Sequence, residues 1–402
     1  MQTQLSASLL ATAQGQEADA ILRTCVHCGF CNATCPTYQL LGDELDGPRG
    51  RIYLIKSLLE GAEVTRTTQL HLDRCLSCRA CETTCPSGVQ YGRLADIGRG
   101  IIEQQVKRPW RERMLRRLLR LFIPYPARFA TVLHLAQWFK PLLPAPLRKS
   151  VPARQKSVAW PVTDNRRRML ILDGCAQPAL APNINAAAAR VLDKLNISLV
   201  RLQNVGCCGA ISYHLGAHEE GLNFMRRNIT AWWPYIESGA RAIVITASGC
   251  GSLVKEYGHL LQHDPDYAEK AARVSAMAHD LSEVLAQQDL SVLKPATGKK
   301  IACHTPCSLQ HAQKLPDVVE NILRQLGFEL THVPDAHLCC GSAGTYSILQ
   351  QELSQELLKN KLTALQSGDP DCIVTANIGC LTHMQSASRI PVKHWIELLD
   401  TV

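Results

Sequence analysis

Apolar residues recur at helical intervals in the first part of this chain. From Leu5 to Leu22 the apolar positions lie three or four residues apart, which predicts a leading helix over residues 1–24. Residues 52–59 place four apolar side chains on one face of a second predicted helix, which Gly61 is expected to end. The N-terminal quarter is therefore predicted to be helical.

From about residue 169 the pattern changes to short apolar runs separated by helical segments. Helical patterns such as 186–195 and 318–326 stand between runs that begin near Met169, Ile243, Ile301 and Ile373. This alternation of strands and helices predicts two α/β lobes with mostly parallel sheets.

Cysteines repeat between the two halves of this region. Cys175 and Cys303, Cys207 and Cys339, and Cys250 and Cys380 are offset by 128, 132 and 130 positions, and each half carries Cys-Cys-Gly, which adds Cys208 and Cys340. Such regularity predicts a duplicated domain. Cysteines that follow parallel strands stand at the sheet edge where α/β folds place their sites.

Two copies of a denser cysteine run precede the lobes. Both follow the spacing C-x2-C-x2-C-x3-C-P, which is the bacterial ferredoxin pattern for cubane clusters, and the fourth cysteine of each run normally binds the other cluster. We therefore predict two [4Fe-4S] clusters, cluster 1 held by Cys25, Cys28, Cys31 and Cys85, and cluster 2 held by Cys75, Cys78, Cys81 and Cys35. Structural zinc or disulfides are the alternative, but zinc sites usually take two pairs, and the run is duplicated.

Composition supports metal ligation in a reducing compartment. Eighteen cysteines among 402 residues, clustered as they are, do not suit a secreted disulfide scaffold. Arginines near the runs are expected to balance the negative charge of thiolate-bound clusters, the alternative being solvated surface positions; they are Arg49, Arg51, Arg74 and Arg79.

A basic segment follows the helical region. Residues 107–149 hold eleven Lys or Arg and one acid, Glu112, although the whole chain has a formal net charge of only +8. Arginines alternate there with apolar residues, as in a basic amphipathic helix that binds an anionic membrane or an acidic partner. The alternative is a linker helix with a solvated basic face. Nucleic-acid binding is not expected, since no recognition motif accompanies the charge.

We therefore predict an α+β multidomain chain: an α-helical ferredoxin-like domain with two [4Fe-4S] clusters, then two tandem α/β cysteine-rich domains. The expected segments are 1–106, the basic linker 107–168, and the lobes 169–296 and 297–402. No signal peptide is evident, and no apolar run reaches the roughly 18 residues of a transmembrane helix. We expect a cytoplasmic protein, peripheral on the cytoplasmic face of the inner membrane.

The duplicated Cys-Cys-Gly motifs and the ferredoxin runs together resemble a known family. The layout is similar to the iron-sulfur subunit of glycolate oxidase, and it also resembles the iron-sulfur subunits of anaerobic glycerol-3-phosphate and lactate dehydrogenases. The resemblance implies FAD-binding flavoprotein partners and a net oxidation of glycolate to glyoxylate. This chain lacks the closing C-x-x-C of domains that hold a non-cubane cluster. The second lobe offers Cys303, Cys307, Cys339, Cys340 and Cys380, and the first offers Cys175, Cys207, Cys208 and Cys250. Whether either set binds a further cluster or zinc, or packs as small buried side chains, stays open.

Missing motifs limit the chemistry of the chain. No G-x-G-x-x-G follows a strand, no P-loop is present, and no histidine pairs with a carboxylate as a general base would. Removal of two electrons and protons from a 2-hydroxy acid is flavin chemistry, so we expect it on another subunit. The chain is predicted to be a non-catalytic electron-transfer subunit, with a heterodisulfide-reductase-like thiol-disulfide reductase or a scaffold as alternatives.

Overall fold

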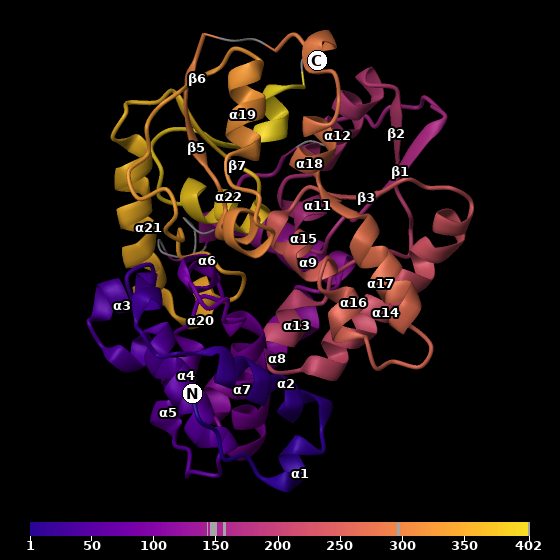
Figure 1. Cartoon of the computed structure of the whole chain (residues 1–402). Helices are drawn as coiled ribbons and strands as arrows, with labels where there is room; N and C mark the ends of the chain where they lie inside the picture. The colour runs from indigo at the N-terminus through magenta and orange to yellow at the C-terminus, as the bar shows by residue number, and fades with distance from the viewer. Residues whose placement is uncertain (143, 145–150, 156–157, 296–297, 401–402) are drawn as a thin grey trace.

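The computed structural model describes residues 1–142, 144, 151–155, 158–295 and 298–400. Figure 1 shows the indigo-to-violet helical domain below two α/β lobes, the first magenta to salmon and the second orange to yellow. The α+β multidomain fold class predicted from the sequence is confirmed: a helical ferredoxin-type region precedes two lobes with parallel sheets.

The N-terminal domain is built from short helices around one apolar core. Leu22, Ile55, Leu72 and Leu94, from four different helices, are almost completely buried together. The helices are α1 (Ala7–Leu10), α2 (Ala13–Thr24), η1 (Phe30–Asn32), α3 (Pro36–Leu41), η2 (Glu44–Asp46), α4 (Pro48–Leu59), α5 (Arg66–Asp73), α6 (Ala80–Thr84) and α7 (Tyr91–Gln105). The loops between these short helices carry the cysteines, and the packed helices on either side fix their positions.

The predicted leading helix is divided into α1 and α2. Thr12 accepts a hydrogen bond from the backbone N–H of Gly15 and so begins a new helix. Gly15 then passes so close to α1 that a Cβ atom there would lie 2.0 Å from the backbone oxygen of Leu9. Helical periodicity continues across the break, which is why the pattern alone predicted one helix.

The first lobe holds a parallel sheet of order β2-β1-β3-β4. Its strands are β1 (Arg167–Ile171), β2 (Ile197–Val200), β3 (Ile243–Ile245) and β4 (Ala278–Asp280). Its helices are α11 (Gln177–Leu180), α12 (Asn183–Lys194), α13 (Ala210–His214), α14 (His218–Glu237), α15 (Ser248–Val254), α16 (Tyr257–Leu260), α17 (Ala268–Met277) and α18 (Leu281–Ala286), with the turn η4 (Leu290–Val292). The buried β-branched and leucine-rich strands explain the continuous apolar runs in the sequence.

The second lobe repeats this topology with the order β6-β5-β7-β8. Its strands are β5 (Lys300–His304), β6 (Glu329–Leu330), β7 (Cys372–Thr375) and β8 (Val392–His394). Its helices are α19 (Val318–Gln325), α20 (Tyr346–Leu349), α21 (Gln351–Gln366) and α22 (Ile378–Gln385), with the turns η5 (Ser308–Ala312) and η6 (Trp395–Leu398). One apolar core includes side chains of both lobes. The lobes also exchange backbone contacts: Ser248 donates to the Ala376 oxygen at 3.1 Å. They therefore form one packed unit.

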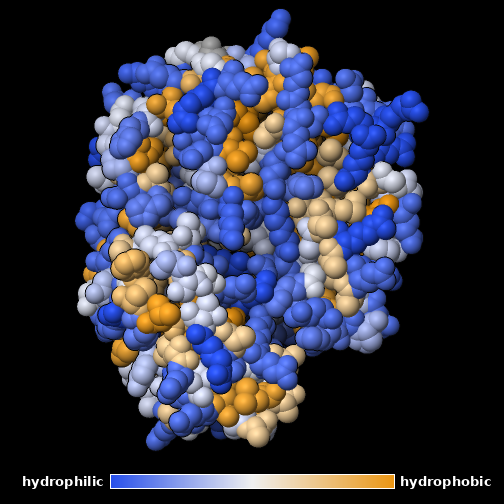
Figure 2. All heavy atoms as spheres, in the orientation of Figure 1, coloured by the Kyte–Doolittle hydropathy of each residue, from blue (hydrophilic) through white to orange (hydrophobic). Residues whose placement is uncertain are grey.

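The helical domain meets the two lobes in different ways. Against the first lobe, Arg79 and Arg93 both pair with Glu256, at 3.0 and 2.9 Å, beside a polar cavity of about 200 Å³. Figure 2 shows mostly hydrophilic residues around the hollow between the domain and the lobes. Against the second lobe the contact is apolar and joins Leu76 with Tyr346.

The basic segment forms helices α8 (Trp110–Phe122) and α9 (Pro126–Trp138), followed by the turn η3 (Lys140–Leu142). Residues 145–150, which hold the end of the predicted basic stretch, lie outside the described residues. Among the described helices, none has the length and apolarity that crossing a bilayer requires.

Helix α8 turns part of its charge inward and exposes apolar side chains together with other arginines. Arg108, just before α8, and Arg116 within it are buried against the helical domain, where both pair with Asp73 at 2.5 and 3.1 Å. The side chains exposed on the opposite face are Trp110, Met114, Leu118 and Leu121. The solvent-facing side of α8 therefore carries Arg113 and Arg117 as well as these apolar side chains.

Candidate iron-sulfur centres

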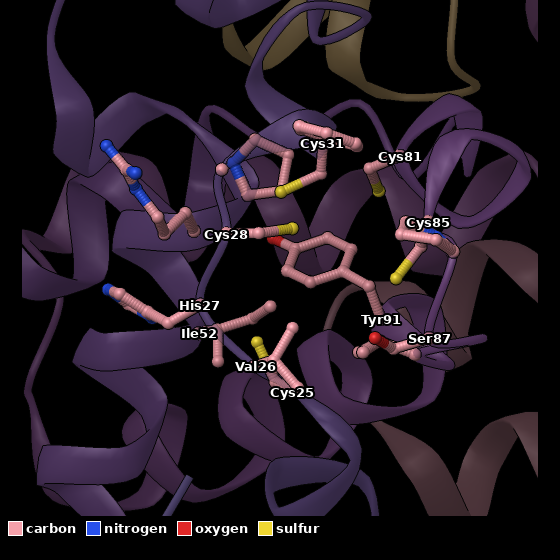
Figure 3. Close-up of a pocket in the computed structure, with 16 residues that line it drawn as sticks. Cys25, Val26, His27, Cys28, Cys31, Ile52, Cys81, Cys85, Ser87 and Tyr91 are labelled. Carbon is pink, nitrogen blue, oxygen red and sulfur yellow. The ribbon is translucent and has the colours of Figure 1, made fainter.

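The four cysteines predicted to hold cluster 1 line one pocket. Cys25, Cys28 and Cys31 come from the loop after α2, and Cys85 comes from the end of α6. Figure 3 shows their sulfur atoms arranged around a common space beside the ring of Tyr91, with Cys81 also at its edge. Burial raises the pKa of the Cys31 thiol to about 11, and the neighbouring thiolates of Cys25, Cys85 and Cys28 add to the effect. Cationic iron would remove that penalty.

The two cysteine loops have matching backbone conformations. His27 and Gly29 have φ angles of 59° and 88°, and the equivalent Ser77 and Arg79 have 52° and 59°. Left-handed residues of this kind turn the chain back sharply, so that three thiols per loop face one side. The backbone N–H of Ser77 lies 3.4 Å from the Cys75 sulfur, as a donor to a thiolate should.

The predicted cluster 2 cysteines also converge. Burial raises the pKa of the Cys78 and Cys81 thiols well above the usual range, and both also feel the charges of Cys75 and Cys35. Cys35 comes from the first run and the other three from the second, so the arrangement in space follows the crossed pairing. All described cysteines are free thiols rather than disulfides. The donors at both sites therefore fit cubane clusters, and the assignment of individual ligands remains a proposal.

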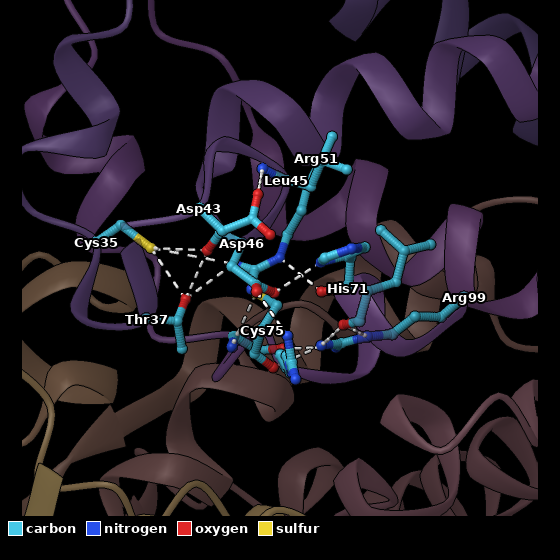
Figure 4. Close-up of polar contacts among 12 residues, drawn as sticks. Cys35, Thr37, Asp43, Leu45, Asp46, Arg51, His71, Cys75 and Arg99 are labelled. Carbon is cyan, nitrogen blue, oxygen red and sulfur yellow. Dashed lines mark hydrogen bonds and ion pairs between the residues drawn. The ribbon is translucent and has the colours of Figure 1, made fainter. Parts of the chain in front are cut away.

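A buried arginine network lies beside the cluster 2 cysteines (Figure 4). Arg51, 1% exposed, donates to the backbone oxygen of His71 at 2.7 Å and points Nη1 at the Cys35 sulfur, 4.0 Å away. Asp46 is fully buried and accepts from Arg51 and from Arg74, at 3.4 and 2.8 Å. Burial opposes ionisation of Cys75, but the positive charges of Arg51 and Arg99 lower its pKa below the usual value.

Of the four arginines expected to balance the clusters, Arg51 points at a predicted cluster 2 ligand, and Arg49 lines the pocket of the cluster 1 cysteines. Arg74 acts through Asp46, Arg49 pairs with Glu44 at 2.6 Å, and Arg79 pairs with Glu256. Sequence reasoning missed Arg99, which donates to the backbone oxygen of Cys75 at 2.6 Å. Its position on α7, 24 residues after Cys75, carries no local signal.

The second lobe brings together a further set of sulfur and nitrogen donors. Ligand atoms of His304, Cys340 and Cys380 all lie within 4.8 Å of one another. His304 is buried and engages Thr375 with Nδ1 at 2.9 Å, while its Nε2 is without a hydrogen-bond partner among the described residues. Cys307 and Cys339 are adjacent, with their sulfur atoms 3.9 Å apart.

Cys303 does not join this set. Side chains alternate along β5, so Cys303 faces away from His304 and packs in the apolar core near Glu320. In the first lobe the thiols of Cys175, Cys207, Cys208 and Cys250 contact one another in series. These contacts raise the pKa of Cys207 and Cys250 and lower that of Cys208. Both lobes thus gather their cysteines at the carboxyl edge of the sheet, and in the described part of the chain the second lobe adds a histidine ligand atom to its set.

Cluster 2 cysteines border the second lobe directly. Cys78 lies near Cys307 and Cys339. The negative charge of the Cys307 thiolate raises the pKa of Cys78, and that of Cys78 raises the pKa of Cys339. Leu76 of the same loop packs with Cys339 and Tyr346. The metal-ligating loop and the lobe donors are therefore neighbours across an apolar contact.

Comparison with known proteins agrees with this architecture. The model of a 4Fe-4S dicluster domain matches residues 21–89, and the model of a cysteine-rich domain matches residues 169–255 and 301–385. A solved structure of a hypothetical protein from Helicobacter pylori shares the fold, with a TM-score of 0.54, 9% identity, and coverage of 96% of this chain and 72% of that chain.

Curated relatives match over nearly the full length. The glycolate oxidase iron-sulfur subunit of Escherichia coli (strain K12) is 58% identical over 401 residues, which is 100% of this chain and 98% of the relative. The probable glycolate oxidase iron-sulfur subunit of Bacillus subtilis (strain 168) is 31% identical and covers 90% and 88%. Lactate utilization protein A of Bacillus velezensis is 26% identical over 56% of this chain and 96% of its own length. The chain therefore belongs to the family of glycolate oxidase iron-sulfur subunits.

Proposed function

We propose that this chain is the electron-transfer subunit of a complex that oxidises glycolate to glyoxylate. The observation that carries the proposal is the convergence of eight ferredoxin-type cysteines into two adjacent sets in a chain similar over its full length to glycolate oxidase iron-sulfur subunits. Oxidation of glycolate releases two electrons and two protons, and we assign that step to FAD on partner flavoprotein subunits.

The residues of this chain would hold and tune the redox centres. Cys25, Cys28, Cys31 and Cys85 would bind cluster 1, and Cys75, Cys78, Cys81 and Cys35 would bind cluster 2. Bound cubanes exchange single electrons, which divides the two-electron oxidation into two transfers. Arg51 and Arg99 place positive charge against the second set, and Leu76 packs between Cys78 of this set and Cys339 of the second lobe.

Because the fourth cysteine of each run is assigned to the cluster of the other run, the proposal predicts which cysteine variants should lose the same cluster. We expect Cys35→Ser to damage the same cluster as Cys78→Ser, and Cys85→Ser the same cluster as Cys28→Ser. The assay is iron and acid-labile sulfide per chain together with EPR of the reduced protein. About eight irons in the wild type, and residual spectra that match in these pairs, would support the proposal. Stoichiometric zinc in place of iron would refute it.

A thiol-disulfide reductase is the alternative function that the gathered lobe cysteines keep open. The purified chain would then reduce a low-molecular-weight disulfide with an artificial electron donor and without any flavoprotein. We expect no such activity, and reduction of the clusters by glycolate only when the flavoprotein subunits are present.

We also propose peripheral contact with the cytoplasmic face of the inner membrane through α8 and α9. Trp110 and Trp138 are 66% and 79% exposed, and neither Arg113 nor Arg117 has an acidic partner among the described residues. Aromatic and apolar side chains flanked by unpaired arginines suit an anionic lipid surface.

Vesicle binding tests this contact. Each arginine near an anionic surface contributes about 1 kcal/mol, so Arg113→Gln with Arg117→Gln should weaken binding to phosphatidylglycerol vesicles about tenfold or more. Added salt should weaken wild-type binding as well. Equal binding of wild type and variant, or equal binding to neutral phosphatidylcholine vesicles, would refute the contact.

A further inference from the structure

A second exposed apolar surface lies over the cluster 1 cysteines. Val26 is 68% exposed, Phe30 62% and Tyr53 54%; Val26 and Phe30 flank Cys28, which is itself exposed, in the loop, and Tyr53 contacts His27 of the same loop. Val26 and Phe30 line the same pocket as the cysteines, and the ring of Tyr53 packs edge-on against that of His27 at 6.5 Å. We call Val26, His27, Phe30 and Tyr53 the cluster 1 face. Figure 3 shows Val26 and His27 on the Cys25–Cys28 side of this pocket.

The internal repeat shows what covers the equivalent surface of the other loop. Leu76 occupies the position of Val26 and Ala80 that of Phe30, yet they are only 6% and 2% exposed. The second lobe covers Leu76 by packing Cys339, Tyr346 and Leu357 around it. One loop therefore meets a protein surface within the chain, and its counterpart exposes the same positions.

Charge around the cluster 1 face favours a protein surface over lipid. Arg49, which lies against Gly29 in the loop, pairs with Glu44 at 2.6 Å, and Arg23 pairs with Asp19 at 2.7 Å. These basic groups are neutralised locally, unlike Arg113 and Arg117 of α8. An apolar patch with a neutralised rim is typical of a protein–protein contact, where aromatic side chains are enriched and unpaired charges are few.

We propose that the cluster 1 face is the docking surface for the flavoprotein subunit and the point where electrons enter the chain. This inference rests on the proposed function. Electron transfer weakens steeply with distance, so the donor must approach the more accessible set of cysteines. Cys28 is exposed, whereas Cys78 is half-buried and lies beside Cys307 of the second lobe. Phe30 and Tyr53 would be the aromatic anchors of the contact.

Two double variants separate this contact from the membrane contact. Phe30→Ser with Tyr53→Ser removes two exposed side chains of the cluster 1 face, and Leu118→Ser with Leu121→Ser removes two of comparable exposure from α8 as the control. Each protein is mixed with purified flavoprotein subunits reduced by glycolate. Binding is measured by calorimetry, and cluster reduction by stopped-flow loss of visible absorbance. Iron content and EPR after dithionite reduction establish that the clusters are intact.

We expect the Phe30/Tyr53 variant to bind at least tenfold more weakly and to be reduced at least tenfold more slowly at subsaturating flavoprotein, with normal reduction by dithionite. The α8 variant should behave as wild type. If the Phe30/Tyr53 variant loses iron, Tyr53→Lys, which lies on α4 outside the cysteine loop itself, provides the same comparison. Wild-type rates in the face variants, or loss of binding in the α8 variant, would overturn the docking surface alone. Failure of glycolate and flavoprotein to reduce the wild-type chain would overturn the proposed function and this inference together.

Discussion

Removal of the buried charge of Arg51 should lower the reduction potential of cluster 2. Arg51 Nη1 lies 4.0 Å from the Cys35 sulfur, and the guanidinium also acts on Cys75. Reduction adds one negative charge to the cluster, so a nearby positive charge favours the reduced state. Arg51→Gln shortens the side chain but keeps an N–H donor near the position of Nε, which donates to the His71 oxygen, and it removes the charge.

The size of the effect follows from distance and screening. One charge about 4 Å from another is worth about 4 kcal/mol at an effective dielectric constant of about 20. The added electron is spread over the whole cluster, and Asp46 already offsets part of the Arg51 charge. We therefore expect about 1–2 kcal/mol, which is about 40–90 mV for a one-electron couple.

An EPR-monitored redox titration measures this shift. Cluster 1 serves as the internal reference, because Arg51 is buried beside Cys35 and Cys75 and does not line the pocket of Cys28. Arg51→Lys, which retains a positive charge, should recover most of the potential. If Arg51→Gln leaves cluster 2 unchanged, raises its potential, or shifts both clusters equally, the electrostatic reasoning is wrong.

Three further predictions follow from single contacts. If the second lobe holds metal, Cys340→Ser should lower the metal content of the chain, whereas Cys303→Ser should not, because Cys303 faces the opposite side of β5 from His304. Elemental analysis measures the metal content, and an equal loss in both variants would contradict the assignment. Gly15→Ala should lower the free energy of unfolding by about 1–3 kcal/mol, because its Cβ would meet the Leu9 backbone; a neutral result in urea denaturation would show that α1 moves freely. Burial raises the pKa of Asp280 to about 6, above its value of about 4 in the unfolded chain. The protonated carboxyl therefore contributes up to about 3 kcal/mol to the free energy of unfolding below pH 4, and this contribution is lost as the pH rises through 6. Asp280→Asn should flatten the stability profile between pH 4 and 6, and an unchanged profile would refute the assignment.

Local spacing and periodicity were enough to predict the cysteine sets and the lobes. The cysteine runs and the strand-helix alternation are properties of neighbouring residues, and both reappear in three dimensions. The inward-facing charge of α8 was not predictable in this way. A helical pattern shows that two faces differ, but the choice of face depended on Asp73, 35 residues before Arg108. The sequence places His304 beside the second-lobe thiols, but it does not show that strand alternation turns His304 toward Cys340 and Cys380 and Cys303 away from them.

The different surroundings of the two cysteine loops favour one direction of electron transfer through the chain. Two loops with the same cysteine spacing and the same left-handed turns would be interchangeable if they lay in the same surroundings. Leu76 is covered by the second lobe while Val26 is exposed. The loops therefore share a cysteine spacing but differ in their access to a partner protein. Arg51 and Arg99 favour electrons on the covered set, which lies beside Cys307 and Cys339. An electron that enters at the exposed loop is therefore drawn toward the second lobe, and a cluster 2 potential below that of cluster 1 in the wild-type protein would be the clearest sign that this order is wrong.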